Sequence, residues 1–128
     1  MNKELIELQR NSKATAVVIL NDEYKQLLNS VVMKANVKDE ILFGKKSGNP
    51  VFKQKLEDKS KNEEISYFII YGIDELSEEM QNRFVGLVKD REFDGYYLPE
   101  NCIIVFTVKN KESYKKISKE LYHFCVIA

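Results

Sequence analysis

The chain has 128 residues, a length that suits one domain, and 44% of them are hydrophobic while 31% are charged. Twenty basic side chains balance twenty acidic ones, so the net charge is zero and a dedicated nucleic-acid or membrane-surface binder is not expected. No apolar run reaches the roughly 18–20 residues that a membrane-spanning helix needs, and the N-terminus lacks a signal-peptide pattern, so we expect a cytoplasmic protein.

Short apolar runs, rich in β-branched and aromatic residues, predict the strands of a parallel sheet. Because none of them alternates with polar residues, each is expected to be buried on both faces, with helices on either side. The runs are 16–20, 67–71, 102–106 and 124–127, with 41–43 as a weaker fifth candidate. Cys102 and Cys125 lie inside two of these runs, and we expect both to be buried, reduced thiols.

Apolar residues at helical spacing predict three helices between the strands. The stripes are Tyr24, Leu27, Leu28, Val31, Val32 and Ala35; Met80, Phe84, Leu87 and Val88; and Tyr114, Ile117 and Leu121. Asn21, Ser77 and Ser113 are expected to lie at the starts of these helices. Strands that alternate with helices predict right-handed crossovers, and hence one α/β domain over 1–128, a three-layer αβα sandwich around a mostly parallel five-stranded sheet.

Other segments do not fit this alternation. A short amphipathic segment, 3–9, precedes the first strand, residues 44–50 have turn chemistry, and 54–64 reads as a solvated loop or a loose helix. Residues 91–101 predict a hairpin that turns at Asp94-Gly95. Alternate residues of a hairpin face opposite ways, so one of Tyr96 and Tyr97 should pack inward and the other should point outward.

A series of landmarks runs through the second half of the chain. In order they are Ile73-Asp74-Glu75-Leu76, Gln81-Asn82, Arg91-Glu92, Gly95, Leu98-Pro99, Thr107 and Phe124. This order resembles the second half of the core domain of AAA+ ATPases, especially the MoxR-like and related groups. The resemblance implies a P-loop NTPase-like topology, with the strand at 16–20 between those at 102–106 and 124–127. In the family, ATP and magnesium would be the cofactors.

The phosphate-binding loop of that family is missing from its expected place. Such a loop wraps backbone N–H groups around the phosphates and adds a lysine and a hydroxyl. After the strand at 16–20 the sequence is NDEY, with two acids and no glycine or lysine, so phosphate should be repelled. The only other candidate, GKKS at 44–47, has Asp39 where the first glycine should stand and its hydroxyl one residue too late.

The acidic pair that would hold magnesium and orient water also fails to align. In the register set by the landmarks, these positions fall on Tyr71 and Gly72, which can do neither. In an alternative register, Asp74 and Glu75 form the working catalytic pair.

Two further positions that act on the nucleotide in the family also depart from its pattern. The polar sensor position after the fourth strand is occupied by Lys109, with Asn110 next to it. The position of the arginine finger, which stabilises transition-state charge, is occupied by His123.

The leading hypothesis is therefore a catalytically inactive AAA+-like domain, without cofactor or metal. It would act as a protein-binding or scaffold module for a partner such as an active ATPase, with Tyr96 and Tyr97 as partner-binding residues. One alternative is a reduced ATPase that uses Asp74 and Glu75 with ATP and magnesium. Another is a nucleic-acid-binding module that uses the lysines and the same two tyrosines.

Overall fold

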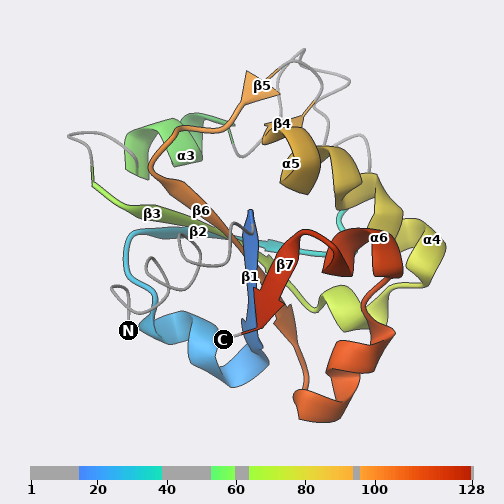
Figure 1. Ribbon diagram of the computed structural model, residues 1–128. Coiled ribbons are helices and arrows are strands. Elements are labelled where there is room, and N and C mark those ends of the chain that lie inside the picture. The colour runs from blue at the N-terminus through green and yellow to red at the C-terminus, as the bar shows by residue number, and fades with distance from the viewer. Residues whose placement is uncertain (1–14, 39–52, 60–63, 94–95, 128) are drawn as a thin grey trace.

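The computed structural model describes residues 15–38, 53–59, 64–93 and 96–127, and shows an α/β protein built on one parallel sheet (Figure 1). The strands of this sheet are β1 (Ala16–Leu20), β2 (Ser30–Lys34), β3 (Ser66–Tyr71), β6 (Cys102–Val108) and β7 (Cys125–Ile127). Two further strands, β4 (Glu92–Phe93) and β5 (Tyr96–Tyr97), pair with each other as an antiparallel hairpin.

Short helices connect the strands. The α-helices are α3 (Lys53–Lys59), α4 (Glu78–Gln81), α5 (Val85–Asp90) and α6 (Lys119–Tyr122). The 3-10 helices are η1 (Asn21–Gln26), η3 (Ile73–Glu75), η4 (Asn82–Phe84) and η5 (Lys111–Lys116). None of the helices that the structure describes is long and apolar enough to cross a membrane.

The strands are arranged in the order β2-β3-β6-β1-β7, and every neighbouring pair is parallel. Val18 of β1 lies opposite Phe106 of β6 on one side and Ile127 of β7 on the other. The prediction that the first strand is central, between the strands at 102–106 and 124–127, is therefore confirmed.

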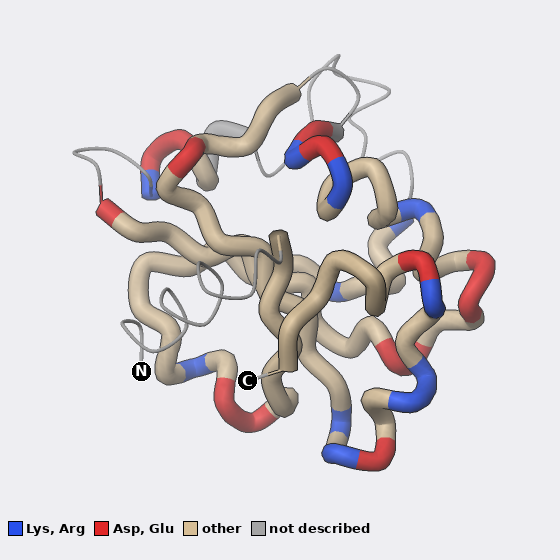
Figure 2. The backbone as a smooth tube through the Cα atoms, viewed as in Figure 1, with Lys and Arg blue, Asp and Glu red and all other residues tan. Residues whose placement is uncertain are grey.

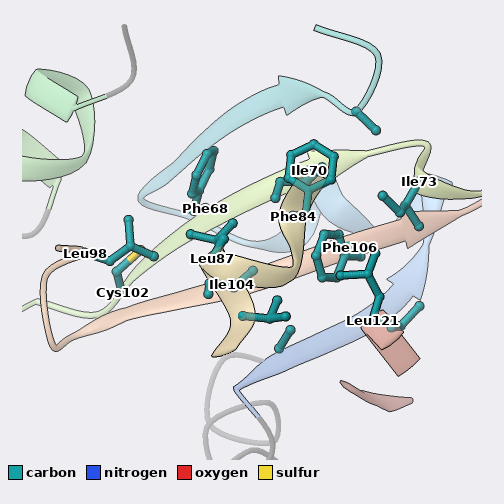
Figure 3. Packing of buried hydrophobic residues seen from close by; sticks show 14 of the residues in the cluster. Phe68, Ile70, Ile73, Phe84, Leu87, Leu98, Cys102, Ile104, Phe106 and Leu121 are labelled. Atoms are coloured by element: carbon teal, nitrogen blue, oxygen red, sulfur yellow. The ribbon is translucent and has the colours of Figure 1, made fainter. Parts of the chain in front are cut away.

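The helices are distributed over the two faces of the sheet according to the direction of each crossover. From β2 the chain moves in one direction to β3, β6 and β7, and right-handed crossovers put all these connections on one face. Leu56, Phe84, Leu87 and Leu121 from the helices are buried there in one cluster with inward-facing strand residues (Figure 3). Phe84 packs edge-to-face on Phe106 of β6, with ring centroids 6.1 Å apart.

The connection from β1 to β2 runs the opposite way and lies on the other face. Tyr24 and Leu27 from this connection pack against a second buried cluster that includes Val17, Ile19 and Val105. The whole connection is described, and it holds the six-residue η1 and no α-helix. The helical layer that the sandwich prediction requires on this face is thus absent from the β1–β2 connection.

The predicted first helix, with its stripe from Tyr24 to Ala35, is wrong. The chain leaves η1 at Gln26, turns at Asn29, whose φ is 59°, and forms the edge strand β2. The Asn29 amide holds this turn by donating to the carbonyl oxygens of Lys59 and Ile65. The adjacent β-branched residues Val31 and Val32 favour a strand. The strand buries the Val31 side chain in the core and exposes that of Val32.

Two other helix predictions need smaller corrections. Ser77 caps α4 as predicted by accepting a hydrogen bond from the Met80 N–H, but Met80 itself is 45% exposed, and Gln81 is buried instead. The predicted helix from Ser113 is divided into η5 and α6, capped by the side chains of Asn110 and Ser118. The helix α3, residues 53–59, covers the first part of the segment 54–64 that was predicted as a loop or a loose helix.

Several predicted segments lie outside the described residues, namely 3–9, 41–43, 44–50 and the Asp94-Gly95 turn. Among the described residues, the second sheet strand along the chain is β2, in a segment predicted as helical. Both cysteines are free thiols as predicted, with Cys102 buried and Cys125 partly buried.

Candidate functional site

The carboxyl ends of β1, β3 and β6 meet at one edge of the sheet, where open parallel sheets bind their ligands. Here the protein's own polar groups bond to one another. The Thr107 hydroxyl, on β6, accepts a hydrogen bond of 2.9 Å from the Gly72 N–H and donates one of 2.6 Å to Asn21 Oδ1. Asn21, expected to cap a helix, instead links β1 to β6.

Gly72 occupies a backbone conformation that suits glycine. Its φ is +79°, and a Cβ at this position would lie 3.3 Å from Glu75 Oε2. A carboxylate residue in place of Gly72 would be strained by this positive φ. The preceding residue, Tyr71, packs edge-to-face against Tyr24, with ring centroids 5.4 Å apart. In the AAA+ register, Tyr71 and Gly72 stand at the magnesium and base positions. Here Tyr71 makes a ring contact and Gly72 forms a left-handed turn.

Carboxylates follow β1, at the place where the AAA+ resemblance would put a phosphate-binding loop. The Leu20 N–H donates to Glu23 Oε1 over 3.2 Å, so this acid occupies a backbone donor of the β1–η1 turn. Asp22 is exposed beside it in the first turn of η1. A phosphate at this turn would lose a donor and meet two negative charges.

Asp74 and Glu75, the alternative catalytic pair, lie in η3 at the same edge. Asp74 is partly buried; its Oδ2 accepts a hydrogen bond from the Lys109 N–H, and its Oδ1 is buried without a partner among the described residues. Glu75 is exposed. Within the described part of the chain, no group of three or more His, Cys, Asp and Glu side chains is placed to hold a metal ion.

Lys109 and His123 stand where the AAA+ resemblance would put the sensor and the arginine finger. Neither side chain takes part in the hydrogen bonds described above at this edge of the sheet. Lys109 contributes its backbone N–H to Asp74, and its side chain is exposed. His123 is exposed at the end of α6, where its N–H bonds to the Lys119 carbonyl and its ring contacts Phe124 edge-on.

Tyr96 and Tyr97 lie on β5, whose chain continues into the amino end of β6, far from the edge that holds Asp74. The predicted hairpin is confirmed, and the two rings point in different directions as expected. Tyr96 is half-buried against the core cluster, and its pKa is raised to about 12 by burial and by the charge of Glu57 on α3. Tyr97 is 67% exposed, and the carboxylate of Glu92 opposite it raises the pKa of its hydroxyl.

Arg91 fixes the base of the hairpin, a role that the sequence analysis did not predict. It ends α5 in the left-handed conformation, with φ 55°, and its carbonyl oxygen accepts a hydrogen bond from the Leu98 N–H. Its guanidinium donates to the carbonyl oxygens of Pro99 and Cys102, over 2.8 and 2.6 Å. A lone arginine between a helical stripe and a predicted turn was the one available sign.

Comparisons with known proteins add no relative. No protein-family model matches the chain, and no curated protein or solved structure matches it significantly.

Proposed function

We propose that this protein is a catalytically inactive, AAA+-like domain that works by binding another protein. Support for the AAA+ likeness comes from the landmarks in the second half of the chain and from the central position of β1 between β6 and β7. An active ATPase of the same fold class is one partner that would suit such a domain.

The bonded carboxyl edge argues against nucleotide chemistry. The Gly72 N–H, the Thr107 hydroxyl and the Asn21 side-chain oxygen are hydrogen-bonded in series, and Glu23 accepts from the Leu20 N–H. A nucleotide would have to break these hydrogen bonds and bring its phosphates next to Asp22 and Glu23. The reduced-ATPase alternative would have to rely on Asp74, whose Oδ2 already accepts the Lys109 N–H.

The single observation that carries the protein-binding proposal is Tyr97. Its ring is 67% exposed on β5, in a hairpin whose base is held by Arg91 and whose other tyrosine, Tyr96, packs on the core. An exposed tyrosine on a fixed support offers contact area at small cost in conformational entropy, which is why tyrosine is frequent at interface hot spots.

The test is partner recovery by tagged wild-type protein and by the Tyr97→Ala variant from the native cell, followed by binding of the recovered partner in purified form. We expect Tyr97→Ala to weaken binding about thirtyfold or more, because hot-spot truncation costs roughly 2 kcal/mol or more. The melting temperature should stay unchanged because the ring is exposed.

A matched control is available in Leu28→Ala, which truncates a side chain that is 71% exposed at another place on the surface, next to β2. Leu28→Ala should bind the partner like the wild type. Equal partner binding by the Tyr97→Ala and wild-type proteins would contradict the proposed contact.

A further inference from the structure

Two adjoining hollows lie on the side of the protein that carries α6. One, of about 470 Å³, is lined by Tyr114, Lys115, Ile117, Lys119, Tyr122 and His123. The other, of about 460 Å³, is lined by Val85, Lys89, Lys119, Glu120, His123 and Phe124. Because Lys119 and His123 line both hollows, we treat them as one surface and call it the α6 groove.

The α6 groove combines positive charge with apolar walls. Its lining residues include three lysines, Lys89, Lys115 and Lys119, and one acidic residue, Glu120. None of these three lysines forms an ion pair with an acidic residue that the structure describes. Figure 2 shows the blue lysine segments along η5 and α6, interrupted by a few red ones. The lysine charges are therefore available to an acidic ligand.

The apolar lining of the groove indicates which class of acidic ligand would fit it. Val85, Ile117 and Phe124 contribute aliphatic and aromatic surface, and Tyr122 is 47% exposed at its rim. Concave apolar surface of this kind receives apolar side chains, as in helix-in-groove and extended-peptide recognition. The lining suits a nucleic acid poorly, because it includes a glutamate among the lysines and no arginine to bind the phosphates.

The groove also continues toward the proposed contact at Tyr97. Lys89 lies in the last turn of α5, and the chain passes from α5 through Arg91 directly into β4 of the hairpin. In Figure 1, α5 lies between the hairpin and α6. One partner could thus contact the hairpin and the groove together.

We propose that the α6 groove binds an acidic protein segment that also carries apolar side chains. This inference rests on the proposed function, because it assigns the chemistry of the partner that also contacts Tyr97. Carboxylates of the segment pair with Lys89, Lys115 and Lys119, and its apolar side chains enter the two hollows.

The experiment uses fluorescence anisotropy with a labelled synthetic peptide in which Glu and Asp alternate with Leu and Phe. Two control peptides replace either the acids by lysine or the apolar residues by serine, and an oligothymidylate of about 12 nucleotides serves as the nucleic-acid probe. We expect the acidic, apolar peptide to bind more tightly than all three, with an affinity that falls as salt is added.

Variants then locate the binding. The double variant Lys89→Glu/Lys119→Glu should bind the peptide about tenfold or more weakly, because it puts like charges against the carboxylates. Tyr122→Ala should weaken binding through loss of apolar contact. A matched control, Lys25→Glu/Lys34→Glu, reverses two exposed lysines of η1 and β2 and should bind like the wild type.

The failures of the two proposals can be told apart. Tyr97→Ala should bind the free peptide normally, because Tyr97 is outside the groove, so its loss of the native partner would report on the hairpin alone. Equal peptide binding by the wild type and the Lys89→Glu/Lys119→Glu variant would overturn the groove proposal. Tighter binding of oligothymidylate than of the acidic peptide would overturn it in favour of nucleic acid.

Discussion

Thr107 and Asn21 are joined by a hydrogen bond of 2.6 Å between the threonine hydroxyl and the asparagine side-chain oxygen. Thr107 is the next-to-last residue of the fully buried strand β6, and Asn21 directly follows β1, the parallel neighbour of β6. Since the same hydroxyl accepts the Gly72 N–H, one side chain links the carboxyl ends of three strands. At this edge of the sheet, the Gly72 N–H, the Thr107 hydroxyl and the Asn21 side-chain oxygen are thus bonded within the protein itself.

Replacement of Thr107 by valine should destabilise the protein by about 1–3 kcal/mol, because the buried Gly72 N–H would lose its acceptor. Thr107→Ser keeps the hydroxyl, so it should destabilise the protein much less than the valine variant. Urea unfolding of the two variants measures the difference. A valine variant as stable as the wild type would show that the hydroxyl link does not hold this edge together.

Loss of the Arg91 side chain should loosen the hairpin. Arg91→Ala removes the two hydrogen bonds to the Pro99 and Cys102 carbonyl oxygens, and should destabilise the protein by about 1–3 kcal/mol. It should also speed amide exchange in β4 and β5, and it should weaken partner binding even though Tyr97 is intact. Unchanged exchange in the hairpin would show that its fixed position has another cause.

The buried hydroxyl of Tyr96 should make stability fall at high pH. Its pKa is about 12 in the folded protein against 10.0 for an ordinary tyrosine, so the unfolded state ionises first as the pH rises. The stabilisation is complete below pH 10 and is lost between pH 10 and about 12. Unfolding free energies across this range should fall more steeply for the wild type than for Tyr96→Phe; parallel curves would contradict the prediction.

The two thiols should be unreactive in the folded protein. Burial raises the pKa of Cys102, and raises that of Cys125 to about 12 from 9.0, so the reactive thiolate of both residues is scarcer near neutral pH than in a free cysteine. A thiol reagent at pH 8 should label neither residue until denaturant is added. Single variants Cys102→Ala and Cys125→Ala assign any labelling, and rapid reaction of either thiol in native buffer would refute the prediction.

The sheet could be predicted from the sequence because strands buried on both faces leave long apolar runs. The runs at 16–20, 67–71 and 102–106 are such strands, and all became buried strands of the parallel sheet. The edge strand β2 could not be recognised in this way, because it does not leave a long apolar run. It is buried on one side only, and its apolar residues follow closely on Tyr24 and Leu27, so that together they imitate a helical stripe.

The candidate site was predictable only in part. The absence of glycine and lysine after β1 is visible in the sequence, but the hydrogen bond from Thr107 to Asn21 joins residues that are far apart in the chain. The opposite orientations of Tyr96 and Tyr97 follow from the period of a strand, and could be predicted. The support from Arg91 depends on a left-handed backbone conformation that few arginines adopt, and the position of the arginine between a helical stripe and a predicted turn does not indicate that conformation.

The central claim, that the carboxyl edge of this sheet does not serve nucleotide chemistry, is tested most directly by calorimetric titration with ATP and magnesium. We predict no binding at micromolar concentrations, because Glu23 and the Asn21–Thr107–Gly72 hydrogen bonds occupy the edge. Micromolar binding of ATP that is lost in Asp74→Asn or Glu75→Gln would contradict the account, and would identify these acids as a working pair.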